Sequence, residues 1–143
     1  MIKIVAGGKK QGGEYGWLIH DYVKRLRKPF DVEFKFLEGE KLDDFLAKWP
    51  FTGNEFVILC DERGMELSSP ELSELLEKKF NESKEIVIII GAAFGVSEEV
   101  RERADFVWSF SRLVFPHMLS RLIVTEQIYR AQEISRGGSY HHE

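Results

Sequence analysis

The sequence is short of cysteine and has no long apolar run. Cys60 is the single cysteine among 143 residues, which excludes an internal disulfide and a zinc site built from cysteines. The longest apolar run, 86–90 with its neighbours, is far too short to cross a bilayer. The first residues also lack the apolar stretch of a secretory signal. We therefore expect a cytoplasmic protein with no bound metal and no membrane partner.

Positive charge is in short supply overall, but it is unevenly distributed. The formal net charge is −4, yet residues 1–35 carry +4, residues 36–108 carry −9 and residues 109–143 carry +1. Phosphate binding depends on local clusters of cations more than on the total charge, so nucleic acid is not excluded as a partner. Solvated helix faces explain most individual charges equally well.

Short apolar runs alternate with helical patterns along the whole chain. This alternation predicts a single α/β domain over residues 1–143, with a mainly parallel sheet and flanking helices. The run at 85–90 is apolar on both faces, as a central strand covered by helices should be. We expect strands at 2–5, 31–37, 55–60, 85–90 and 106–110, and helices at 15–26, 42–49, 70–80, 97–103 and 116–134.

The turn after the run 85–90 is the first candidate ligand site. It contains Gly91 and Gly95, and Ser97 is placed to cap the helix that follows. Ligands of open α/β sheets bind beyond the carboxyl ends of strands, although a plain tight connection would look the same. Glu98 and Glu99 already complement the helix N-terminus, which favours a cationic or neutral ligand over a phosphate.

The segment 108–117 is the second candidate site. A strand end leads into a short loop and then into a helix that is marked by Pro116. Such a loop can offer backbone N–H and C=O groups to an adenine while apolar side chains enclose the ring. The alternative is that Leu113, Val114 and Phe115 are ordinary core residues.

The last helix carries an apolar stripe that runs into a charged pair. Leu119, Leu122 and Ile123 are followed at helical spacing by Glu126 and Arg130. This pair can be an ordinary intrahelical ion pair. Its position on the apolar side instead indicates partial burial at an interface, where unpaired charges are costly. We therefore expect the stripe to contribute to a homodimer.

The tail beyond residues 137–138 is the third candidate site. Two adjacent histidines at a terminus can be the remnant of a tag. A tyrosine beside a histidine is also a plausible pair for stacking on a base and for handling a proton. We expect Tyr140 and His141 to matter for chemistry and little for folding, because they follow two glycines and lie outside the predicted elements.

Taken in order along the full chain, these segments resemble the ribosomal RNA large subunit methyltransferase H family of the SPOUT superfamily. Those enzymes transfer a methyl group from S-adenosyl-L-methionine to N3 of a pseudouridine in 23S rRNA. The resemblance implies a SPOUT-type trefoil knot near the C-terminus, a homodimer, and the large subunit or assembled ribosome as substrate. It is carried by Ile4-Val5-Ala6-Gly7-Gly8-Lys9, Gly91…Gly95, Ser109-Phe110-Ser111-Arg112-Leu113-Val114-Phe115-Pro116-His117, Glu126-Gln127-Ile128-Tyr129-Arg130-Ala131 and Tyr140-His141.

The resemblance also implies roles for particular residues. His141 is expected to accept the N3 proton, and Tyr140 to stack on or orient the base, in the active site of the partner subunit. The cofactor is expected among Cys60, Gly91, Phe110, Ser111, Arg112, Leu113, Val114 and Phe115. RNA is expected to contact Lys9, Lys24, Arg25, His117, Arg121, Arg130 and His142.

Two segments depart from the family pattern. The turn reads Gly91-Ala92-Ala93-Phe94-Gly95, so the second of two usual glycines and an acidic residue are missing. In the tail, His142 stands where a lysine or arginine is usual, which replaces a permanent cation by a titratable one. Two alternatives therefore stay open: a SPOUT methyltransferase acting on tRNA, and a non-catalytic RNA- or ligand-binding relative.

Overall fold

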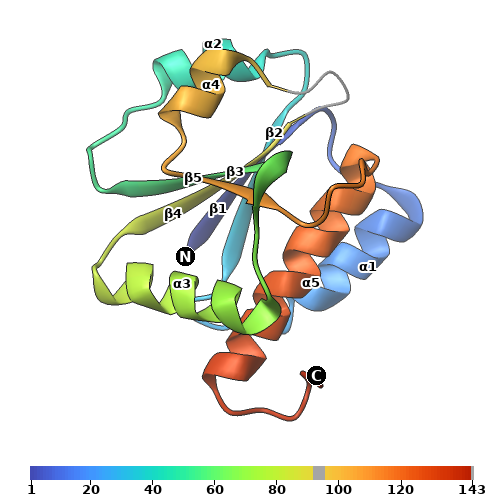
Figure 1. Cartoon of the computed structure of the whole chain (residues 1–143). Coiled ribbons are helices and arrows are strands. Elements are labelled where there is room, and N and C mark those ends of the chain that lie inside the picture. The colour runs from blue at the N-terminus through green and yellow to red at the C-terminus, as the bar shows by residue number, and fades with distance from the viewer. Residues whose placement is uncertain (92–95, 143) are drawn as a thin grey trace.

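Strands and helices alternate along the chain, with five of each in the part that the structure describes (Figure 1). The computed structural model describes residues 1–91 and 96–142. Residues 92–95, which carry the departure from the family's glycine turn, lie outside the described residues. The predicted alternation is confirmed, with boundaries that differ by a few residues. The elements are β1 (Ile2–Gly7), α1 (Gly13–Val23), β2 (Val32–Leu37), α2 (Leu42–Lys48), β3 (Glu55–Glu66), α3 (Ser69–Asn81), β4 (Glu85–Ile90), α4 (Glu98–Arg103), β5 (Phe106–Ser109) and α5 (His117–Ser135).

All neighbouring strands are parallel, in the order β2-β1-β4-β3-β5. The apolar strand β4 lies at the centre between β1 and β3, and its residues after Glu85 are buried. The strand β2 lies at one edge, where its alternating sequence leaves every second residue exposed. The predicted α/β class and the parallel sheet are both confirmed.

Helices cover both faces of the sheet (Figure 1). Because side chains of a strand alternate between faces, β4 contributes to two separate cores. Ile86, Ile88 and Ile90 pack with buried residues of α3 and α5. Val87 and Ile89 pack on the opposite face, with α2 and α4. No helix in the described part of the chain is long and apolar enough to span a membrane.

Strand β3 is longer than the sequence predicted. We expected it to end at Cys60, but it continues to Glu66. Its pairing with β5 is irregular, because Cys60 and Met65 both lie opposite Trp108. The four residues 61–64 therefore leave the regular ladder, as a bulge does. This irregular segment stands at the carboxyl end of the sheet, beside the ends of β4 and β5.

Candidate active site

Residues of the irregular part of β3, of the ends of β4 and β5, and of the loop that leads into α5 line a pocket of about 420 Å³. Every residue predicted to bind the cofactor lines it except Arg112, whose side chain is exposed. The pocket lies where ligands of parallel sheets are generally found, beyond the carboxyl ends of the strands. Its lining is Cys60, Asp61, Glu62, Arg63, Ile90, Gly91, Val96, Trp108, Phe110, Ser111, Leu113, Val114, Phe115, His117 and Ser120.

One side of the pocket is aromatic and aliphatic. The ring of Phe110 meets Trp108 edge-on at a centroid distance of 4.8 Å and lies 6.4 Å from Phe115. Leu113 is 69% exposed and Val114 is 77% exposed. The alternative that these two are core residues is therefore wrong, because they form an apolar rim that a bound ring can cover.

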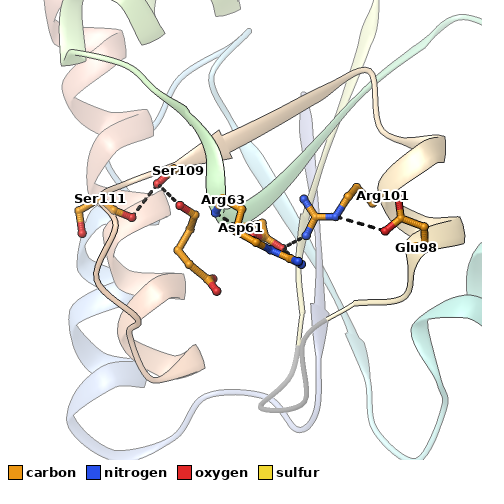
Figure 2. Close-up of polar contacts among 7 residues, drawn as sticks. Asp61, Arg63, Glu98, Arg101, Ser109 and Ser111 are labelled. Atoms are coloured by element: carbon orange, nitrogen blue, oxygen red, sulfur yellow. Dashed lines mark hydrogen bonds and ion pairs between the residues drawn. The ribbon is translucent and has the colours of Figure 1, made fainter.

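The other side is polar and is organised by Asp61 (Figure 2). Its carboxylate accepts hydrogen bonds from the backbone N–H of Arg63, at 2.9 Å, and from the guanidinium of Arg101 in α4. Burial alone would raise the pKa of Asp61, but the bonds from Arg63 and Arg101 outweigh it and lower that pKa. An ionised carboxylate, paired with two guanidinium groups, therefore stands in the pocket wall at neutral pH.

The loop between β5 and α5 is fastened to β3 by a buried hydroxyl (Figure 2). The Oγ of Ser109, which is 1% exposed, lies 3.2 Å from the carbonyl of Glu62 and 2.6 Å from that of Ser111. The Oγ of Ser111 in turn accepts from the backbone N–H of Leu113 at 2.9 Å. These bonds hold the two walls of the pocket together.

Cys60 lines the pocket from β3. Burial raises the pKa of its thiol far above the usual value, and the neighbouring Asp61 adds to this shift. The neutral thiol is a weak nucleophile, so Cys60 acts here as a small apolar wall residue. Among the described residues, no group of three His, Cys, Asp or Glu is placed to hold a metal ion.

The tail turns back at Gly137, whose φ is +71°, and folds against α5 and α1. The ring of Tyr140 meets Tyr129 edge-on at a centroid distance of 4.8 Å. Its hydroxyl lies 3.3 Å from Oε1 of Glu126 and 3.4 Å from the hydroxyl of Tyr22. Burial, the bond with Tyr22 and the charge of Glu126 raise the pKa of Tyr140 well above its usual value. Its hydroxyl therefore remains a donor at neutral pH, and the tail is docked on its own chain.

Arg130 connects the tail to the last helix. One guanidinium nitrogen lies 2.7 Å from Oε1 of Glu126 and another lies 3.1 Å from Nδ1 of His141. A guanidinium can only donate, so Nδ1 of His141 accepts and the proton of the neutral ring is on Nε2. The pair of Glu126 and Arg130 is thus an intrahelical ion pair that also holds the tail.

One chain does not bring the tail and the pocket together. His117 lines the pocket from the first turn of α5, whereas Arg130 binds the tail near its end. At 1.5 Å per residue these positions are roughly 20 Å apart along the helix. Figure 1 accordingly shows the C-terminus far from the loop that leads into α5.

Arg121 does not lie where an RNA-binding residue must lie. Its side chain is fully buried and donates to the carbonyls of Gly7 and Lys9, both at 2.7 Å, and to the side chain of Gln11. Burial lowers the pKa of its guanidinium. The prediction that Arg121 contacts RNA is therefore wrong, because this side chain joins α5 to the end of β1.

The other residues predicted to bind RNA differ in their exposure. Lys9, Lys24 and His142 are exposed. His117 lines the pocket instead of standing on an open surface. The guanidinium of Arg25 lies over the rings of Tyr22 and Tyr129, at 4.8 and 4.6 Å.

A family model described as "Predicted SPOUT methyltransferase" matches residues 1–141. The chain belongs to the SPOUT methyltransferase family. It is 42% identical to the ribosomal RNA large subunit methyltransferase H of Caldicellulosiruptor bescii and 44% identical to that of Caldicellulosiruptor saccharolyticus. Each alignment covers 99% of both chains.

Solved structures with the same fold are more distant in sequence. A probable methylase family protein from Haemophilus influenzae is 12% identical, with a TM-score of 0.60, and covers 99% of this chain and 70% of its own. The SpoU methyltransferase AviRb from Streptomyces viridochromogenes, solved in complex with AdoMet, is 15% identical with a TM-score of 0.50. That match covers 96% of this chain and 58% of AviRb. These likenesses support the α/β fold of this SPOUT chain.

Sequence reasoning missed several residues of the SPOUT pocket. Asp61 directly follows the buried run 55–60, and the carboxyl-end rule applied to the turn at Gly91 would have found it. Trp108, which also lines the pocket, lies in the segment 108–117 that the sequence indicated, although it is not among the residues expected to hold the cofactor. By contrast, Tyr22 and Tyr129 meet Tyr140 only through the packing of α1 on α5, and no local pattern indicates that contact.

Proposed function

We propose that this SPOUT protein is an S-adenosyl-L-methionine-dependent methyltransferase that modifies N3 of a pseudouridine in 23S rRNA, in the large subunit or the assembled ribosome. The single observation that carries the proposal is the pocket at the ends of β3, β4 and β5, which gathers the residues predicted to hold the cofactor. Family membership and the names of the relatives support rRNA as the substrate class.

The pocket fits the proposed cofactor in size and in chemistry. Its volume of about 420 Å³ lies within the range of small-ligand sites. Phe110, Phe115 and the exposed Leu113 would enclose an adenine, and the carboxylates of Asp61 and Glu62 would face the cationic groups. When bound, S-adenosyl-L-methionine supplies an electrophilic methyl group on a sulfonium. The protein supplies position and electrostatic complementarity, which account for much of the rate in such displacements.

The tail of one subunit supplies the groups that act on the base in the partner's pocket. The imide N3 must lose its proton before it attacks the methyl group, and we propose His141 as the acceptor. Because Nδ1 of His141 accepts from Arg130, this role requires that the contact breaks when substrate binds, so that Nδ1 takes the proton. Tyr140, whose hydroxyl is held as a donor, orients the base.

A homodimer is required by this arrangement and is supported by α5. The side of α5 that faces the sheet is Val124, Ile128 and Ala131, all fully buried. The predicted stripe of Leu119, Leu122 and Ile123 is only half-buried and lies outside both core clusters. Sedimentation at micromolar concentration is expected to give a dimer of the 16.6 kDa chain, and a monomer would contradict it. We also propose the trefoil knot, and the cytoplasm as the compartment, from family membership.

The cheapest test separates an enzyme from a non-catalytic relative. Calorimetry is expected to detect binding of S-adenosylhomocysteine by the purified protein, and no binding would favour the non-catalytic alternative. Mass spectrometry of rRNA fragments from cells lacking the gene then identifies the substrate. Loss of one methyl group from a 23S pseudouridine is expected, whereas intact rRNA with an undermethylated tRNA would favour the tRNA alternative.

A further inference from the structure

A second pocket opens on the face of the sheet that α2 covers, and we call it the α2 pocket. Its volume is about 410 Å³, and it shares no lining residue with the proposed cofactor pocket. The strands β1 and β2 contribute Lys3, Glu33 and Lys35 to its lining, and α2 with its C-cap contributes Phe45 and Trp49. The proposed methyl transfer uses none of these side chains, so the pocket is available to another ligand.

The alternation of side chains along β1 and β2 explains why this pocket is charged. Lys3 points to the same face of the sheet as Val5, and Lys35 to the same face as Leu37. Val5 and Leu37 are buried in the core beneath α2. The lysines precede them, towards the amino ends of the strands, and therefore extend an apolar face with charged side chains.

Two ammonium groups of the α2 pocket lie over aromatic rings. The Nζ of Lys3 is 5.4 Å from the ring centroid of Trp49, and the Nζ of Lys35 is 6.0 Å from that of Phe45. In the part of the chain that the structure describes, neither ammonium group forms an ion pair with a carboxylate. The pocket thus combines aromatic ring faces with cations whose charge is not neutralised by a neighbour.

The remaining charged residues of the pocket leave it basic. Lys48 lies 3.9 Å from a carboxylate oxygen of Glu40, and both Lys48 and Glu33 are exposed. Three lysines and two glutamates line the pocket, which gives a net charge of +1 in a chain of net −4. The charge of this pocket therefore favours an anionic ligand.

A nucleotide has the two parts that such a pocket binds. Aromatic side chains stack on the flat face of any base, and lysine contacts the phosphate. Lysine carries its ammonium group on a flexible stem of four carbons. The ammonium groups of Lys3 and Lys35 can therefore move from the rings to a phosphate when a base covers the aromatic side chains.

The α2 pocket lies close enough to the proposed cofactor pocket for one RNA strand to reach both. The sheet register pairs Lys35 with Val5, and Val5 with Ile89. Two strand spacings, about 10 Å, thus separate Lys35 from Ile89. The next residue of β4, Ile90, lines the proposed cofactor pocket. The buried residues of α5 pack on the opposite face of the sheet, so a dimer formed through α5 does not cover the α2 pocket.

We propose that the α2 pocket binds an unpaired nucleotide of the RNA substrate, with the base against Trp49 and the phosphate on Lys3 and Lys35. This inference rests on the proposed function and adds a contact with RNA outside the reacting base. Because stacking tolerates any base, the contact contributes affinity and positions the strand, and it does not select a sequence.

The test combines the kinetics of methyl transfer to ribosomes from cells lacking the gene with binding of a single-stranded RNA oligonucleotide. Lys35→Glu is expected to raise KM for ribosomes by about tenfold, because it replaces a phosphate contact by a repulsion. The kcat should stay within about twofold, since a contact away from the reacting groups is uniform binding. Lys35→Ala should reduce the slope of log affinity against log salt by about 0.7 for the oligonucleotide, the value for one phosphate contact.

Lys78→Glu is the matched control for Lys35→Glu. It makes the same change of charge at an exposed position of α3, which packs on the opposite face of the sheet. Its KM and its affinity for the oligonucleotide should stay within about twofold of wild type.

Trp49 tests the stacking part of the proposal. Trp49→Leu is expected to raise KM by about 5- to 150-fold, which is the free energy of stacking on one base converted at 1.4 kcal/mol per decade. Trp49→Phe should stay within about threefold of wild type, because phenylalanine also stacks. Trp49 also packs against the core beneath α2, so Lys35→Glu, at an exposed position, is the deciding variant if Trp49→Leu fails to fold.

Three outcomes overturn the inference while leaving the proposed function intact. An unchanged KM in Lys35→Glu would mean that the substrate does not use this pocket. Equal increases of KM in Lys35→Glu and Lys78→Glu would reflect the total charge of the protein and not the pocket. A raised KM for ribosomes with unchanged binding of the oligonucleotide would assign the pocket to a ribosomal protein. Failure of the wild-type protein to methylate any ribosome, by contrast, refutes the proposed function itself.

Discussion

The cofactor pocket and the tail differ in how completely one chain builds them. The pocket is enclosed by three consecutive strand ends and is tied together by Ser109 and Asp61. The tail is also ordered, but its partners Tyr22, Glu126 and Arg130 lie at the other end of α5. Roughly 20 Å of helix separates the pocket from the tail, although both are proposed to act in one methyl transfer.

This separation teaches that binding and chemistry can be disrupted independently. A change in the pocket acts on the cofactor whether or not a second chain is present. On the proposed function, a change in the tail leaves that pocket intact and affects the reaction only where two chains meet. Variants in the two regions can therefore test this division.

His141→Ala is expected to reduce methyl transfer by about 10²–10⁴-fold, because it removes a proposed general base. Affinity for S-adenosylhomocysteine should remain within about twofold, since His141 lies far from its own chain's pocket. Part of the activity should return at high pH, where the imide ionises without help. Stopped assays on ribosomes and calorimetry measure the two quantities. An equal loss of cofactor affinity would place the tail in its own subunit's pocket.

Gly91→Val is expected to abolish cofactor binding, because a branched side chain at the end of β4 would enter the pocket. Mixed with inactive His141→Ala and allowed to exchange subunits, it should recover about a quarter of wild-type activity, since half of the dimers then contain one intact composite site. The measurement is methyl transfer by refolded equimolar mixtures. No recovery, with heterodimers present by mass spectrometry, would mean that each chain works alone.

The two arginines of α5 sharpen the same comparison at the level of stability. Arg121→Met is expected to lower the free energy of unfolding by about 3 kcal/mol, because the carbonyls of Gly7 and Lys9 lose a buried donor. Arg130→Met, at a half-buried position, should cost less than about 1 kcal/mol. Urea denaturation checks both. Equal losses of free energy of unfolding in the two variants would contradict a purely structural role for Arg121.

The regions of the molecule also differ in how much of each could be predicted from the sequence. The strands, their parallel direction and most of the pocket residues could be predicted, because strand ends and glycine turns are local features that a parallel sheet brings to one edge. The continuation of β3 beyond Cys60 could not, since its irregular pairing with Trp108 depends on a strand far away in sequence. Arg121 was misassigned for a related reason: a cation on a helix looks alike in sequence whether it meets solvent or backbone carbonyls.

The tail was expected to contribute little to folding, and the docking of Tyr140 on Tyr129 changes that expectation. Tyr140→Ala should lower the free energy of unfolding by about 1–2 kcal/mol, as the loss of an aromatic pair and some apolar burial predicts. Tyr140→Phe should keep the ring contact and lose less than about 1 kcal/mol. Thermal unfolding of wild type and of the two Tyr140 variants measures these losses of stability. An unchanged Tm for Tyr140→Ala would mean that docking of the tail does not stabilise the fold.

The smallest effect is expected at Asp61, in the wall of the pocket. Its pKa is lowered in the folded protein, so ionised Asp61 stabilises the fold above its usual pKa of 3.8, and this contribution is lost as the pH falls through the lower folded value. At pH 7, Asp61→Asn should lower the free energy of unfolding by about 1 kcal/mol or less, because its partner Arg63 is largely exposed and only Arg101 is well buried.

The difference between wild type and Asp61→Asn should shrink as the pH falls below 3.8 and through the lower pKa of the folded protein, because the Asp61 carboxylate then becomes protonated and both side chains are neutral. Glu98→Gln is the matched control, because its carboxylate is exposed and lies 4.0 Å from the same Arg101. That variant should be nearly as stable as wild type at every pH. Urea titrations at a series of pH values measure all three proteins. If the lower free energy of unfolding of Asp61→Asn persisted at low pH, the shape of the Asp61 side chain, and not its charge, would account for its contribution to stability.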